Sequence, residues 1–217
     1  MFDNNYSKYY DLFNSNKPYK KEIQFVYKWA EKPTWIFDIG CGTGSYWKYY
    51  PKDCYILGIE KSQEMIELAK HPKSIFCEDI MTYQHCESLH GRFGCVTALF
   101  DVMNYIPKHD WWKNLPLDRG GYFIFDIWDK EKVDKDGFQL SFKMKNGVSR
   151  TITPLNYNGK TVDLEIEVTG KDLEFKEKHT MYLYSQADIK KFCGDEFEIV
   201  EVKPTKKWQT WYKLRRK

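Results

Sequence analysis

A glycine-rich loop between an apolar strand and the start of a helix limits the folds open to this chain of 217 residues more than any other feature. Residues 34–39 are mostly apolar and run into Asp-Ile-Gly, and Gly40, Gly42 and Gly44 follow at alternate positions. Glycines at such a place let the backbone turn sharply and approach a ligand closely. An ordinary glycine-rich turn is the alternative, and three glycines directly after a strand make it the weaker one.

The stretches on both sides of this loop alternate between strand-like and helix-like patterns. We expect strands at 34–39, 54–60, 74–77, 93–100 and 121–128, and helices at 20–32, from about 44 to 51, and after Ser62. A last helix at 185–193 and two strands at 197–202 and 209–214 follow. Strands separated by helices indicate right-handed βαβ units. The predicted fold class is α/β, a Rossmann-like seven-stranded, mostly parallel sheet with an antiparallel final hairpin.

Residues 129–184 break this alternation. Strand-like stretches occur at 138–144, 149–157, 161–169 and 174–184, with Asn-Gly turns at 146–147 and 158–159. They are too short to hold a large core alone, so we predict an inserted antiparallel β cap. We take residues 1–217 as one domain, in which the cap joins an N-terminal helical lid (1–32), a ligand-binding core (33–128) and a C-terminal part (185–217). The stretch 6–19 is aromatic-rich and lacks a clear helical period.

The spacing of the glycines discriminates between nucleotide-like ligands. A nicotinamide or flavin site expects G-x-G-x-x-G, whose helix N-terminus meets a pyrophosphate. Here the third glycine comes one residue early, and the G-K-[ST] of a phosphate loop is absent. Asp38 beside the loop repels a pyrophosphate and suits a ligand with an ammonium group. S-adenosylmethionine has that ammonium group and a positive sulfonium.

Two more carboxylates follow the next two strands. Glu60 ends the second strand, where a carboxylate accepts hydrogen bonds from both ribose hydroxyls. Asp79 follows the third strand, where it suits the adenine amino group while the backbone of Ile80 approaches the ring. Met65 on the intervening helix packs against adenine or belongs to the core, two alternatives that the sequence leaves open.

Together these residues resemble the cofactor motifs of the class I S-adenosylmethionine-dependent methyltransferases, and the resemblance covers essentially the whole sheet. It implies methyl transfer with S-adenosylmethionine as the cofactor. The cofactor-binding residues that it implies are Tyr19, Asp38, Gly40, Cys41, Gly42, Gly44, Glu60, Lys61, Met65, Asp79, Ile80 and Phe100.

A closer similarity is to bacterial N-methyltransferases that act on nucleotide-linked amino sugars. It is carried by Tyr9-Tyr10-Asp11-Leu12, Lys17-Pro18-Tyr19, the strand 123–128, the inserted hairpins and the strand with His179. It implies that Tyr10 lines the active site, that Tyr19 contacts the methionine end of the cofactor, and that the insertion helps to hold a sugar nucleotide. The chain departs from that family at 100–105, where the amino-sugar enzymes have small hydroxyl residues and this chain has Asp-x-x-Asn-Tyr after the phenylalanine.

Methyl transfer from a sulfonium is an in-line displacement, for which alignment contributes about 7–11 kcal/mol. An amine acceptor with a pKa near ~8 is substantially unprotonated at neutral pH and needs orientation more than a base. A hydroxyl acceptor needs a base. The catalytic candidates are Tyr10, Asp101, Asn104, Tyr105 and His179. O-methylation, methylation of a protein amine, a dinucleotide-dependent oxidoreductase and a catalytically silent cofactor-binding protein are the alternatives.

Composition limits the partners. Lys plus Arg is 34 and Asp plus Glu is 31, a difference of +3, and this balance does not favour duplex nucleic acid. No apolar run approaches about 18 residues and no signal pattern opens the chain, so we expect a cytoplasmic protein without a membrane segment. His85, Cys86 and His90 lie close together, but their spacing is irregular for zinc and no metal is expected. We expect a small-molecule substrate, and a homodimer stays open.

Overall fold

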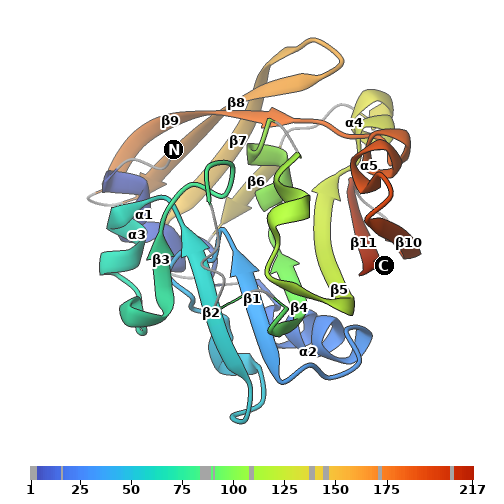
Figure 1. Cartoon of the computed structure of the whole chain (residues 1–217). Helices are drawn as coiled ribbons and strands as arrows, with labels where there is room; N and C mark the ends of the chain where they lie inside the picture. Colours follow the sequence, from blue (N-terminus) through green and yellow to red (C-terminus); the bar gives the residue numbers. More distant parts are fainter. Residues whose placement is uncertain are drawn as a thin grey trace.

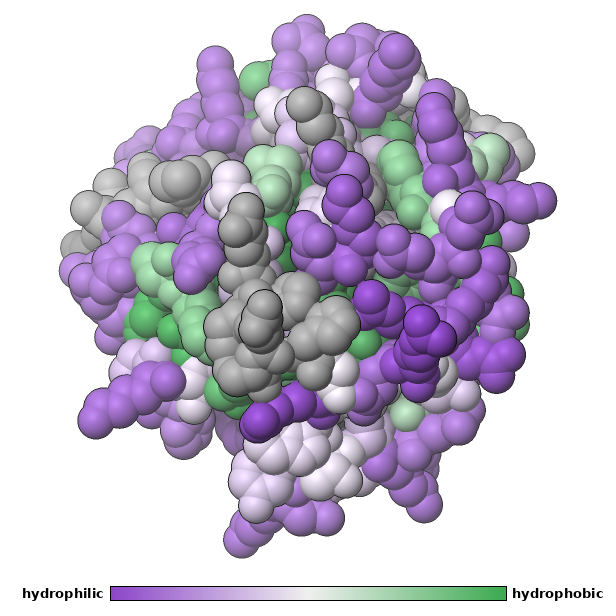
Figure 2. Space-filling view, viewed as in Figure 1, coloured by the Kyte–Doolittle hydropathy of each residue, from purple (hydrophilic) through white to green (hydrophobic). Residues whose placement is uncertain are grey.

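A computed structural model describes residues 4–15, 17–83, 89, 91–107, 110–136, 140–143, 147–170, 173–205 and 208–217. It contains two sheets, and Figure 1 shows the smaller one lying across the ends of the strands of the larger one. Figure 2 shows that polar and charged side chains cover most of the face seen in that view. No helix in the described ranges is long and apolar enough to cross a membrane.

The larger sheet has seven strands and confirms the predicted fold class. Its strands β1 to β5 are mutually parallel, and β11 runs antiparallel between β5 and β10. In spatial order the strands are β10 (Phe197–Pro204), β11 (Gln209–Arg216), β5 (Leu117–Trp128), β4 (Phe93–Ala98), β1 (Trp35–Ile39), β2 (Tyr55–Glu60) and β3 (Ile75–Cys77).

Alternating side chains of the central strands fill two cores, one on each face of this sheet. Phe37 of β1 and Phe125 of β5 point into the core that contains α5, whereas Ile36 and Ile124 point into the core that contains α2. Such continuous apolar strands are typical of a parallel sheet buried on both faces. The helices are α1 (Asn4–Phe13), α2 (Tyr19–Trp29), α3 (Gln63–Glu67), α4 (Lys130–Asp136) and α5 (Gln186–Cys193), with 3-10 turns η1 (Trp47–Tyr49), η2 (Pro72–Ser74), η4 (Val102–Tyr105) and η5 (Asp110–Asn114).

The inserted cap is an antiparallel sheet, as predicted. It consists of β6 (Leu140–Lys143), β7 (Ser149–Tyr157), β8 (Thr161–Gly170) and β9 (Leu173–Tyr182), in this spatial order. One face is apolar because alternate residues of β8 are buried, and Phe13 of α1 packs in the same cluster. The cap therefore shares its core with the N-terminal helix.

Several local predictions were wrong. The helix expected from about 44 to 51 is only the short turn η1, because the bonds there join residues three apart and Pro51 follows at once. Helix α4 was not expected, whereas α1 forms inside the predicted N-terminal helical lid although the stretch 6–19 lacks a clear helical period. Strand β4 ends at Ala98 rather than at position 100. The cluster of His85, Cys86 and His90 lies outside the described residues.

Candidate active site

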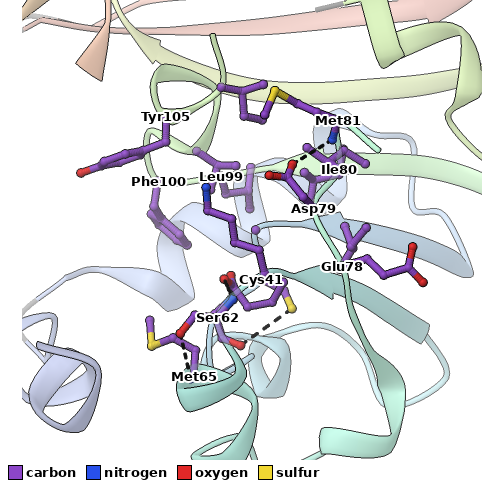
Figure 3. Close-up of a pocket in the computed structure, with 18 of the residues that line it drawn as sticks. Cys41, Ser62, Met65, Glu78, Asp79, Ile80, Met81, Leu99, Phe100 and Tyr105 are labelled. Atoms are coloured by element: carbon purple, nitrogen blue, oxygen red, sulfur yellow. Dashed lines mark hydrogen bonds between the residues drawn. The ribbon is translucent and has the colours of Figure 1, made fainter. Parts of the chain in front are cut away.

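A cavity of about 400 Å³ lies at the carboxyl ends of the parallel strands, under the cap. This edge is where doubly wound folds bind ligands, and the volume suits a small molecule. In Figure 3, Phe100 and Tyr105 lie on one side of the cavity, and Glu78, Asp79 and Ile80 lie on the other. The predicted site residues that line the cavity are Tyr10, Gly40, Cys41, Gly42, Glu60, Lys61, Met65, Asp79, Ile80, Phe100, Tyr105 and His179.

The glycine loop needs its first glycine for two reasons. Gly40 has φ +61°, a left-handed conformation that side chains disfavour. A Cβ on it would also lie 2.7 Å from both methyl carbons of Val102. The loop and the turn after β4 are therefore in direct contact, and both form the floor of the cavity.

Asp38 holds this loop from behind. It is buried, and its carboxylate accepts hydrogen bonds from Tyr46 Oη (2.6 Å), Trp47 Nε1 (2.6 Å) and Thr97 Oγ1 (2.7 Å). Burial raises the pKa of Asp38 to about 6, although the three donors act in the opposite direction. Asp38 and Gly44 do not line the cavity. The Asp38 oxygens bind the scaffold of the loop, and the expectation that Asp38 suits the ammonium group of the cofactor stays a prediction.

Glu60 does line the cavity, and its carboxylate spans two segments. Oε2 accepts from the backbone N–H of Gly42 (3.0 Å) and Oε1 accepts from that of Ser62 (2.9 Å). Burial raises the pKa of Glu60 against the effect of these backbone donors. Ser62 caps α3 by accepting from the N–H of Met65, whose methyl carbon would lie 3.4 Å from a Cβ at position 42. The loop, strand β2 and helix α3 thus meet around one carboxylate.

The turn after β4 is strained and is held by a residue that sequence inspection missed. Phe100 and Asp101 both have φ +66°, which costs of order 1–3 kcal/mol each. Asp126 on β5 is fully buried and accepts from the N–H of Phe100 (2.8 Å), the N–H of Asp101 (3.1 Å) and Gln209 Nε2 (2.8 Å). A single carboxylate inside the apolar run of β5 was the available signal.

Two of the catalytic candidates do not line the cavity. Asp101 is absent from the lining, and burial together with the charge of Asp126 raises the pKa of Asp101. Asn104 is fully buried, where its Oδ1 accepts from the N–H of Trp128 (2.8 Å) and its Nδ2 donates to the carbonyl of Tyr182 (2.7 Å). Asn104 therefore ties β5 to the cap through two backbone groups and does not face the cavity.

Tyr105 and His179, by contrast, meet at the cavity. Tyr105 Oη lies 3.0 Å from His179 Nδ1, and His179 Nε2 lies 2.8 Å from Glu177 Oε2. His179 and Glu177 are both buried. An ionised carboxylate only accepts, so Glu177 fixes a proton on Nε2, and Nδ1 of the neutral ring then accepts from the Tyr105 hydroxyl. Glu177 was not predicted, although it lies two positions from His179 on the same strand face.

The N-terminal helix closes one side of the cavity. Tyr10 lines the cavity, and the neighbouring Asp11 accepts from the hydroxyls of Thr43 (3.0 Å) and Ser45 (2.6 Å) in the glycine loop. We call these two hydrogen bonds, which join the N-terminal helix to the glycine loop, the latch, and the sequence did not predict them. Tyr19 does not line the cavity; it stacks on Tyr46 (5.9 Å between ring centroids) and packs edge-on against Phe100 (5.1 Å). Tyr19 therefore supports two residues of the wall, Tyr46 and Phe100.

The sheet topology and the cavity at its carboxyl edge can be compared with those of known proteins. Neither the family models nor the curated proteins match this sequence. Solved structures do match, and the fold they share with this chain is that of S-adenosylmethionine-dependent methyltransferases.

Three of these structures illustrate the likeness. The chain is similar to a methyltransferase from Clostridium acetobutylicum, with a TM-score of 0.77, 21% identity and 96% of each chain covered. It is similar to an amino pentose methyltransferase of calicheamicin biosynthesis from Micromonospora echinaspora, with a TM-score of 0.79 and 17% identity over 100% of this chain and 98% of that chain. A sugar N-methyltransferase from Streptoalloteichus matches with a TM-score of 0.70 and 16% identity, over 96% and 93%. At these identities the comparison establishes the fold.

Proposed function

We propose that this chain transfers a methyl group from S-adenosylmethionine to a nitrogen atom of a small molecule, with a nucleotide-linked amino sugar as the leading acceptor. The observation that carries the proposal is that one cavity brings together the glycine loop, Glu60 and the pair of Tyr105 and His179. The similar structures include one solved with S-adenosylmethionine bound and a sugar N-methyltransferase.

The wall of the cavity that we call the loop wall consists of the glycine loop, Glu60, Met65 and residues 79–80, and it fits this cofactor. The Glu60 carboxylate at the end of β2 suits the ribose hydroxyls, and the glycine at position 40 allows close approach of the backbone. Asp79 holds its own turn through Oδ1, which accepts from the N–H of Met81 (2.9 Å), beside the Ile80 backbone expected at the adenine. When bound, S-adenosylmethionine supplies a methyl group on a positively charged sulfur, so no metal is needed to activate the leaving group.

The wall that we call the cap wall consists of Tyr105 and residues 178–180 of β9, and it orients the acceptor. The Tyr105 hydroxyl donates to His179, so its oxygen lone pairs accept an N–H of the substrate and turn the nitrogen lone pair toward the cofactor side of the cavity. Methylation of an amine leaves one excess proton on nitrogen. Tyr105 and His179 form a path for that proton, because the Tyr105 hydroxyl contacts His179 Nδ1 and the other ring nitrogen contacts Glu177. Tyr10 from the lid and Phe100 from the β4 turn exclude water from the same space.

The test is a radiolabelled methyl-transfer assay on nucleotide-linked amino sugars beside their hydroxyl analogues. We expect label in the amine and little in the hydroxyl compound. Transfer to the hydroxyl compound alone would replace N-methylation by O-methylation. Binding of S-adenosylmethionine without transfer to any acceptor of the panel would favour a catalytically silent binding protein.

A further inference from the structure

One edge of the cap faces the cavity with its main chain. Strand β9 is the last strand of the four-stranded sheet, and Lys178, His179 and Thr180 all line the cavity. Successive side chains of a strand point to opposite faces, so three consecutive residues share one cavity only when the strand edge is turned toward it. The Thr180 hydroxyl donates to Asp163 Oδ1 (2.7 Å) on the face opposite to His179. Thr180 therefore meets the cavity mainly through its backbone.

The direction of each main-chain group follows from two contacts near the end of β9. The N–H of Leu183 donates to the carbonyl of Lys160, on the β8 side. The carbonyl of Tyr182 instead accepts from Asn104 Nδ2, on the opposite side. Because main-chain groups alternate between the two edges of a strand, Thr180 and Lys178 direct their N–H and C=O toward the edge that β8 does not cover.

These groups are available to a ligand. Within the described part of the chain, no other element donates to or accepts from the main chain of Thr180 or Lys178. An unpaired edge of this kind is a ready template for a partner that offers complementary donors and acceptors. Thr180 presents one donor beside one acceptor, in fixed orientation and next to the pair of Tyr105 and His179.

We propose that the free edge of β9 at Thr180 binds the acceptor through a planar group that carries a donor beside an acceptor. This inference rests on the proposed function. In a nucleotide-linked amino sugar such a group is the nucleobase, whose base-pairing edge complements one N–H and one C=O. The main chain of Thr180 in the cap then forms hydrogen bonds with the nucleobase, while the amine of the sugar lies at Tyr105.

The test replaces Thr180 by proline, which removes the main-chain donor. Proline is tolerated on edge strands where its nitrogen faces away from the neighbouring strand. Thr180→Val measures the loss of the hydroxyl alone, and Lys176→Pro places proline on the same edge but outside the cavity. We expect Thr180→Pro to raise the KM for a uridine-diphosphate-linked amino sugar about five- to ten-fold above the Thr180→Val value. The S-adenosylhomocysteine Kd should stay unchanged, and Lys176→Pro should not alter KM.

A base-methylated substrate makes the test specific. The 3-methyluridine analogue lacks the base N–H that would donate to the Thr180 carbonyl. It should therefore bind both the wild type and Thr180→Pro more weakly than its parent, because proline keeps this carbonyl. Equal KM values for Thr180→Pro and Thr180→Val would overturn the inference. If no amino sugar is methylated, the proposed function fails, and the edge is tested by titrating uridine diphosphate into the S-adenosylhomocysteine complexes of the wild type and Thr180→Pro. Tighter binding of an acetylated dipeptide amide than of uridine diphosphate would reject the nucleobase.

Discussion

The two walls of the cavity are built over different distances along the chain. In the loop wall, Asp38 bonds Tyr46 and Trp47, which lie 8 and 9 positions away, and Gly42 bonds Glu60 18 positions away. In the cap wall, Tyr105 and His179 are 74 positions apart, and other contacts there span 78. Apart from Thr97, which lies 59 positions from Asp38, these contacts of the loop wall fall within one βαβ unit. The cap wall exists only once the cap has folded over the core. We expect the first to bind the cofactor and the second to select the acceptor.

The largest effect that separates the two walls should come from Glu60→Ala. It removes a carboxylate whose two proposed hydrogen bonds to ribose would be worth about 1.5–3 kcal/mol each, so the cofactor Kd should rise roughly 10²- to 10⁴-fold. The acceptor KM, measured at saturating cofactor, should change little. Glu67→Ala on the exposed side of α3 is the matched control. A cofactor Kd that Glu60→Ala leaves unaltered would place the ribose elsewhere.

Asp38 should make the stability of the loop wall depend on pH. Its pKa in the folded protein is about 6, above the ordinary 3.8, so the folded state holds this proton more tightly than the unfolded chain. The stabilisation is present below about pH 4 and is lost as the pH rises through 6. Asp38→Asn cannot titrate. The free energy of unfolding of Asp38→Asn, taken relative to that of the wild type, should therefore increase by up to about 3 kcal/mol between pH 4 and pH 7. Urea unfolding at both pH values measures this, and a constant difference would refute it.

In the cap wall, His179→Ala should lower kcat and leave the cofactor Kd unchanged. The fall should be about tenfold if the acceptor amine needs only orientation, and about 10²- to 10⁴-fold if a hydroxyl must lose its proton. Tyr105→Phe breaks the same hydrogen bond, so the double variant should lose little more than either single one. Losses that simply add would mean that the two residues act separately.

The smallest effect should come from the latch that joins the lid to the loop wall. Asp11→Ala removes the acceptor of two hydroxyl groups and should raise the cofactor Kd about two- to ten-fold. Asp11→Asn keeps an acceptor oxygen and should recover most of the affinity. Calorimetry on both variants decides the point, and wild-type affinity in Asp11→Ala would show that the lid closes without this contact.

The sequence predicted the loop wall well because local patterns encode it. The spacing of the glycines, the carboxylate that ends β2 and the Ser62 cap are each recognisable within a few residues. The role of Asp38 was missed because its three donors come from side chains with no pattern of their own. Two of these donors, Tyr46 and Trp47, lie at the start of the short turn η1 that replaces the expected helix.

For the cap wall, the sequence predicted the arrangement of strands but not most of the contacts between side chains. Alternation and Asn-Gly turns gave the antiparallel strands, and His179 was placed at the cavity. Nothing local distinguishes Asn104, which binds backbone groups of β5 and β9, from Tyr105, which lines the cavity. The roles of Asp126 and Glu177 became clear only from the structure. Asp126 binds the main chain of another segment, at Phe100, and Glu177 binds His179, whose other partner is distant in the sequence.

The most direct measurement is a calorimetric titration of S-adenosylhomocysteine into the wild-type protein, repeated with His179→Ala. A loop wall that binds the cofactor independently of the cap predicts one site with the same Kd in both proteins. Absence of binding to the wild type at about 1 mM ligand, which corresponds to a binding free energy weaker than about 4 kcal/mol, would contradict the cofactor assignment. A Kd for S-adenosylhomocysteine that rises steeply in His179→Ala would contradict the claim that the loop wall binds the cofactor without help from the cap wall.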